Sequence, residues 1–208
     1  MIGKIKEIIL VNLKNMFGPK TKRKIVVFSV DDYGNVRLDS KQARTHLDAA
    51  GLPIYSRFDQ LDTLETKQDL EQLYAVLSSV KDKNGTPAIF TPFALPCNIN
   101  FEKMATEDYQ QFHCETLPET YKKLVEKNPE AYQGAWELWQ DGIAKGLMKP
   151  QFHGREHLNL TIFNDKLQKR DPQLLVALQN RSFTSISDEN YPAMQSTAAL
   201  DFWDLNEN

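Results

Sequence analysis

The sequence predicts an α/β domain built on parallel strands, because short apolar runs alternate with segments of helical periodicity. Three runs have the length and apolar character of buried strands: Ile25–Val30, Ala88–Thr91 and Leu147–Phe152. A weaker strand candidate lies near Ser182–Ile186. The segments between the runs show the spacing of amphipathic helices. Strands separated by helical segments are typical of a parallel sheet covered by helices.

Three helices are predicted between the strands. Ser40–Ala50 reads as a surface helix, in which His46 is most simply a polar residue. A second helix is predicted from an apolar face made by Leu70, Leu73, Tyr74, Leu77 and Val80. A third begins at Asn128-Pro129-Glu130, which combines a cap, a proline at the first position and an early acid, and it ends near Gly146. Its apolar stripe is Tyr132, Ala135, Trp136, Trp139 and Ile143. This spacing favours core packing of the two tryptophans over a sugar-stacking surface.

Length, composition and charge restrict the class of protein. The chain has 208 residues, of which 41% are hydrophobic and 25% charged, so it can form one domain with a substantial core. Cys97 and Cys114 show neither zinc-finger nor redox spacing, so we predict a reducing, cytoplasmic location. Seven of the 25 basic residues but only one of the 28 acidic residues lie in residues 1–24. The remainder is acidic, which argues against nucleic-acid binding.

Residues 1–24 are predicted as a basic amphipathic helix and linker, distinct from a domain at 25–208. Apolar residues recur at helical spacing and stop at Gly18-Pro19; they are Ile2, Ile5, Ile9, Leu13 and Met16. This helix could make peripheral contact with an anionic membrane surface. The favoured alternative is a helix that covers one end of the domain, because cationic flanks are common on surface helices.

Residues that carry chemistry follow the predicted strands. Asp31 and Asp32 come after the first strand, Thr91 ends the second, and His153 and His157 follow the third. The carboxyl ends of parallel strands share one edge, so we expect these residues on one rim. Two imidazoles and a carboxylate are a common ligand set for Zn²⁺ with an open coordination position. The alternatives are an ordinary strand-end turn at the acids and a hydrogen-bonded surface pair of histidines.

Arg155 lies between the two histidines and has three candidate roles. It could neutralise Asp31 or Asp32, bind an oxygen of a substrate, or form a plain surface ion pair. Together with Thr91 it is a candidate substrate-binding residue. We expect His113, in an acidic and aromatic-rich stretch, to have a packing role.

These residues resemble two motifs of the polysaccharide deacetylase superfamily, of the carbohydrate esterase family 4 type. Asp31-Asp32-Tyr33-Gly34 matches a strand that ends in Asp-Asp-x-Gly, and His153 and His157 match His-x-x-x-His. The surrounding residues look like a divergent branch found among bacterial surface-polysaccharide proteins. The resemblance implies that Asp32, His153 and His157 hold a divalent metal, with Zn²⁺ expected, and that Asp31 is the catalytic base. It implies an N-acetylated glycan substrate, from which metal-bound water removes N-acetyl or O-acetyl groups.

The resemblance also implies a (β/α) barrel, and the chain departs from the family pattern in three ways. The motifs are about 120 residues apart, more than the usual family spacing. No histidine follows His157, where the family has its general acid, and the strand candidates are too few to close a barrel. We therefore expect a partial or distorted barrel with outer helices and a C-terminally incomplete domain. The alternative function is a catalytically weak or inactive module that binds a glycan or a partner in surface-polysaccharide assembly.

Overall fold

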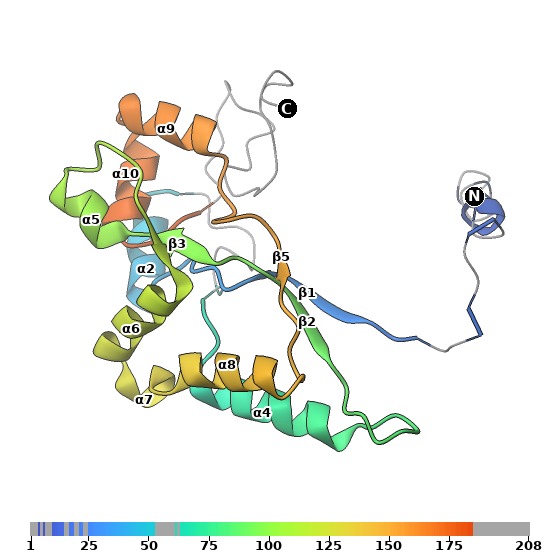
Figure 1. Ribbon diagram of the computed structural model, residues 1–208. Coiled ribbons are helices and arrows are strands. Elements are labelled where there is room, and N and C mark those ends of the chain that lie inside the picture. The colour runs from blue at the N-terminus through green and yellow to red at the C-terminus, as the bar shows by residue number, and fades with distance from the viewer. Residues whose placement is uncertain are drawn as a thin grey trace.

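The computed structural model describes residues 4, 6, 10–14, 17, 18, 21, 22, 25–52, 61 and 63–184. This part of the chain is a mixed α/β structure with a parallel sheet, a separate antiparallel strand pair and eight helices (Figure 1). The parallel sheet contains β1 (Phe28–Tyr33), β2 (Phe90–Ala94) and β5 (Gln151–Phe152), in the order β1-β2-β5. The predicted α/β class with parallel strands is confirmed. The described strands form an open sheet, and they close no barrel.

Strand β1 contains a bulge near its carboxyl end. Its pairing with β2 runs from Phe28 to Val30, which lies opposite Pro92, and resumes at Tyr33, opposite Ala94. Two residues of β1 therefore face a single residue of β2, which is the definition of a β-bulge. The two residues are the predicted acidic pair, and the second of them has a backbone φ of 55°.

The first strand begins three residues later than predicted, and it is exposed rather than buried. Ile25, Val26 and Val27 precede β1 and are 64%, 77% and 70% exposed, and Phe28 is 61% exposed. The physical reason is position: β1 is an edge strand that pairs only with β2 among the described elements. An apolar run indicates a strand, but it does not indicate how many neighbours that strand has.

The third predicted strand is shorter than expected. Only two of its residues form β5, and Met148 makes an isolated bridge with Phe90. Pro150 interrupts the pairing because proline has no backbone N–H to donate. In the weak fourth candidate, Ser182–Thr184 lie outside any strand, and positions 185 and 186 lie outside the described residues.

Two of the predicted helices form, and each begins directly after a capping residue. Helix α2 (Lys41–Ala49) begins after Ser40, whose side chain accepts a hydrogen bond from the backbone of the first turn. Helix α4 (Lys67–Ser79) begins at a capping box in which Thr66 and Asp69 each bond to the other residue's backbone.

The third predicted helix is divided in two. Helix α7 (Pro129–Tyr132) ends before Gly134, which has a φ of 89°, and helix α8 (Ala135–Ala144) begins after it. The left-handed glycine reverses the local chain direction, which the apolar spacing did not indicate. Trp139 of α8 is 3% exposed, so the expected core position is confirmed for this tryptophan.

Several short elements were not predicted. The strands and α5 among them are too short for a periodic pattern to be recognised, whereas α6 and α9 are at least as long as the predicted α2 and were missed. They are β3 (Cys97–Ile99), α5 (Phe101–Thr106), β4 (Cys114–Thr116), α6 (Leu117–Lys127), α9 (Leu160–Gln168) and α10 (Pro172–Gln179). The first four lie between the two motifs, and β3 pairs with β4 in the antiparallel sense.

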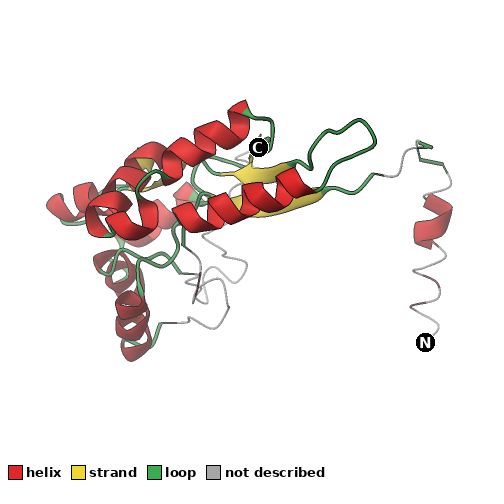
Figure 2. Cartoon of the chain, turned by 90° about the horizontal axis from the view of Figure 1, so that it is seen from below, coloured by secondary structure: helices red, strands yellow, loops and turns green. Residues whose placement is uncertain are grey.

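Two hydrophobic clusters stabilise the described domain. One packs α4, α6 and α8 around Leu70, Phe90 of β2 and Trp139. The other gathers α2, α5, α9 and α10 around Leu47 and Phe163. In Figure 2, which views the molecule from below, helices of the first group lie in front of the strands. The helices of the first cluster therefore cover this face of the parallel sheet.

The basic segment at 1–24 is described only in part. Residues 10–14 are helical. Leu10, Val11 and Leu13 in this stretch are 59%, 53% and 47% exposed. Ile2, Ile5, Ile9 and Met16 of the predicted apolar face lie outside the described residues. Within the described chain, every helix is too short or too polar to cross a membrane.

Gly34→Ala should destabilise the fold. Gly34 has a φ of +97° where the chain leaves β1, and an added Cβ would lie 2.9 Å from the carbonyl oxygen of Leu95. We expect the free energy of unfolding, measured by urea denaturation, to fall by about 1–3 kcal/mol. Gly85→Ala is the matched control, because Gly85 has a φ of +82° but nothing within 4 Å of the added atom. Equal losses in the two variants would show that the contact with Leu95 is unimportant.

Candidate metal centre

Two acids and two histidines meet at the carboxyl ends of β1 and β5. His157 Nε2 lies 2.9 Å from Asp32 Oδ1, and His153 Nε2 lies 3.2 Å from the same oxygen. His153 Nε2 also lies 2.9 Å from Asp31 Oδ1. One ligand atom from each of Asp32, His153 and His157 lies within 4.8 Å of the others. The predicted convergence of the two motifs on one rim is therefore confirmed.

The backbone explains how each group reaches this point. Adjacent residues of a regular strand point to opposite faces, but the bulge in β1 turns both Asp31 and Asp32 toward one imidazole. His153 N donates to the carbonyl oxygen of Ala94 at 3.1 Å, which extends the pairing of β5 with β2. His157 has a φ of 50° and lies in the segment 153–159 that connects β5 with α9. Both histidines therefore belong to this strand-to-helix connection.

The donor set fits a divalent cation. Asp32 Oδ1 is buried and accepts no hydrogen bond of regular geometry from the described residues, although two imidazole nitrogens lie close to it. Such an oxygen lacks the partner that buried polar atoms normally have, and a shared cation would supply one. The side chains of Asp32, His153 and His157 are 25%, 25% and 15% exposed, so solvent can reach them. His157 Nδ1 is also buried without a partner among the described residues.

Arg37 is a component of the site that the sequence did not predict. Its Nη2 donates to Asp32 Oδ2 at 2.8 Å, and its side chain is only 9% exposed. Burial alone would raise the pKa of Asp32, but the contact with His157 and the charges of Arg37 and His153 outweigh burial and lower this pKa. Asp32 is therefore held as a carboxylate, which is the form that binds a metal.

Of the two candidate substrate-binding residues, Arg155 forms an ion pair, and Thr91 lies at a different point of its strand than expected. Arg155 bonds to its neighbour Glu156, with Nη2 3.0 Å from Oε1 and Nε also in contact with that carboxylate. Of its three candidate roles, the ion pair is the one observed, and its partner is Glu156 rather than Asp32. Thr91 is the second residue of β2, opposite Ser29, so the expectation that it ends its strand was wrong. It therefore lies within the sheet, three residues before the end of β2.

The remaining two histidines have other partners. His46 Nδ1 lies 2.9 Å from Asn180 Oδ1, on the exposed side of α2. His113 Nε2 lies 2.6 Å from a carboxylate oxygen of Glu107. These contacts agree with the structural roles expected for both residues, and His46 is suitable as a control position.

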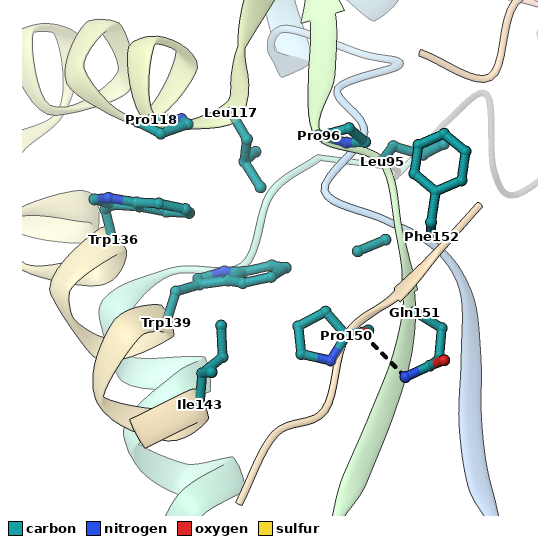
Figure 3. Close-up of a pocket in the computed structure, with 11 residues that line it drawn as sticks. Leu95, Pro96, Leu117, Pro118, Trp136, Trp139, Ile143, Pro150, Gln151 and Phe152 are labelled. Carbon is teal, nitrogen blue, oxygen red and sulfur yellow. Dashed lines mark hydrogen bonds between the residues drawn. The ribbon is translucent and has the colours of Figure 1, made fainter. Parts of the chain in front are cut away.

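Two cavities lie near the candidate centre. The larger, of about 530 Å³, has walls formed by residues 30–35, 63–65 and 69, and so includes both acids of the centre together with Glu65. The smaller, of about 290 Å³, is apolar and lies between α8 and the ends of β2 and β5 (Figure 3). In Figure 3, Trp136 and Trp139 form one side of it, opposite Pro150 and Phe152. The larger cavity is the one that could admit a polar substrate to the acids.

Comparisons of the chain with protein-family models, curated protein sequences and solved structures found no match.

Asp32→Asn should reduce the acid sensitivity of the metal-free protein. Because the folded-state pKa of Asp32 lies below its ordinary value of 3.8, the carboxylate stabilises the fold at higher pH. That stabilisation is lost as the pH falls through the folded-state pKa. With EDTA present, we expect the free energy of unfolding to fall more steeply in the wild type than in the variant between about pH 5 and pH 2. Asp48→Asn, on the exposed surface of α2, should follow the wild type; parallel profiles for all three proteins would contradict the assignment.

Proposed function

We propose that this protein is a metal-dependent hydrolase that removes N-acetyl or O-acetyl groups from a bacterial polysaccharide. One observation carries the proposal: Asp32, His153 and His157 offer ligand atoms within 4.8 Å of one another, with the second carboxylate of Asp31 beside them. The two motifs that converge are those that resemble polysaccharide deacetylases. The proposal extends to the fold, in which β1, β2 and β5 would belong to a distorted barrel of that type.

In this proposal Asp32, His153 and His157 would hold the ion. One carboxylate and two imidazoles suit Zn²⁺, and they leave a coordination position open. When bound, the cation would supply Lewis acidity, which polarises the acetyl carbonyl and makes water more acidic. Arg37 supports the site by keeping Asp32 ionised and by fixing its second oxygen.

Asp31 is the proposed general base. Its side chain is 70% exposed and its carboxylate lines the larger cavity, so a substrate can approach it. Its Oδ1 lies 2.9 Å from His153 Nε2, which places it beside the proposed ligands. A carboxylate in this position can take the proton from water as the water attacks the acetyl carbon.

A second candidate is a module that binds a glycan or a partner with little or no turnover. It is favoured by the openness of the described sheet and by the absence of any histidine after His157 in the sequence. A water-exposed centre stabilises developing charge less well than an enclosed one. The two candidates share the metal and differ in acetate release.

The metal site is tested by isothermal titration with Zn²⁺. We expect the wild type to bind one equivalent, and the double variant His153→Ala plus His157→Ala to bind at least about 100-fold more weakly, because two of three ligands are lost. His46→Ala removes a histidine outside the centre and should bind as the wild type does. Equal affinity in the double variant and the wild type would eliminate the proposed site.

The reaction is tested by release of acetate from N-acetylated oligosaccharides in the presence of Zn²⁺. Asp31→Asn keeps the size of the side chain but removes the base, so turnover should fall by about 100-fold or more while Zn²⁺ affinity is retained. Oligosaccharide binding without acetate release by the wild type would favour the binding module instead.

A further inference from the structure

Glu65 is a partly buried acid that the metal centre does not use. It lies just before the capping residue Thr66 of α4. Its Oε1 accepts close hydrogen bonds from Tyr121 Oη and Trp139 Nε1, and these two donors are themselves 2.9 Å apart. Among the described residues, no lysine or arginine forms an ion pair with Glu65. Its carboxyl group is therefore surrounded by neutral donors and by aromatic rings.

These surroundings favour the protonated form of Glu65. Burial raises the pKa of Glu65, and the negative charge of Asp69 raises it further. The hydrogen bonds from Tyr121 and Trp139 act in the opposite direction, but they do not offset burial. A carboxyl group whose pKa is raised stays protonated to a higher pH than an ordinary glutamic acid does, and in that form it can act as a proton donor.

Glu65 also lines the larger of the two cavities near the candidate centre. Leu64, Glu65 and Asp69 line the same cavity as Asp31 and Asp32. Trp139, whose indole N–H donates to Glu65, also lines the apolar pocket (Figure 3). Glu65 thus contacts two aromatic side chains and lines the cavity that also contains the two acids of the centre.

Given the hydrolase function proposed above, we propose that Glu65 is the proton donor to the departing nitrogen of an N-acetylated sugar. Water attacks the acetyl carbon, a C–O bond forms, and Asp31 takes one proton from the water. The C–N bond then breaks, and the nitrogen takes the Glu65 proton and leaves as the free amine. The second product is acetic acid, which releases its proton to solvent and becomes acetate, and transfer of the proton from Asp31 to Glu65 through solvent restores both groups. The preferred substrate class is therefore amides, whose nitrogen cannot leave unprotonated.

The dependence on the leaving group tests this role. Glu65→Gln should lower acetate release from an N-acetylated oligosaccharide by about 100-fold or more. It should leave hydrolysis of 4-nitrophenyl acetate within a few-fold of the wild type, because the nitrophenolate leaves without a proton. Retained ester hydrolysis and retained Zn²⁺ affinity also show that the variant is folded. Glu71→Gln, the same change on the exposed surface of α4, should alter neither reaction.

A second measurement does not depend on turnover. The infrared difference spectrum of wild type minus Glu65→Gln at pH 7, recorded without metal, should contain the C=O stretch of a protonated carboxylic acid. An equal loss of amide and ester hydrolysis in Glu65→Gln, unchanged amide hydrolysis, or a carboxylate band in the spectrum would each overturn the role of Glu65. If the wild type binds no Zn²⁺ or hydrolyses neither substrate, the hydrolase proposal itself fails, and the donor role fails with it.

Discussion

The bulge in β1 is the constraint on which the candidate centre depends. In a regular strand Asp31 and Asp32 would point to opposite faces, and only one of them could reach His153. The bulge places both carboxylates within 3.2 Å of that imidazole, with Asp32 in the left-handed backbone region. A non-glycine residue in that region costs on the order of 1 kcal/mol and persists only where its surroundings fix it. Here the fixed elements are the pairing with β2 and the ion pair to Arg37.

Arg37 determines the charge of the site as well as its geometry. The cluster contains one guanidinium, that of Arg37, and two carboxylates, those of Asp31 and Asp32. Its net charge is therefore negative whenever the imidazoles are neutral. Arg37 binds Oδ2 of Asp32, and the other oxygen lies beside the histidines without a hydrogen bond of regular geometry in the described part of the chain. A bound cation would offset the negative charge of the cluster and would give Asp32 Oδ1 a partner. The arrangement is therefore compatible with a bound divalent cation.

The sequence predicted that the aspartate motif and the histidine motif lie close together, but it did not predict the bulge in β1 that brings both acids to His153. The ends of parallel strands share an edge whatever their register, so Asp32, His153 and His157 could be placed on one rim. The bulge depends on pairing with a distant strand, which no local pattern encodes. Likewise, Arg37 and Glu65 were not identified because their partners are fixed by the tertiary fold. Only the apolar neighbours on both sides of Arg37 hinted that this charge is buried.

The environments of Asp31 and Glu65 give two carboxyl groups of one cavity different chemistry. Asp31 is open to solvent beside the proposed ligands, whereas Glu65 is enclosed by Tyr121 and Trp139. Hydrolysis of an amide requires that a proton be taken from water and that one be given to the nitrogen, and two acids in unlike surroundings can divide these tasks. Glu65 comes from the segment before α4, whereas Asp31 comes from the end of β1. An acid donor built this way needs no histidine after the second motif, so the lack of one does not by itself exclude catalysis.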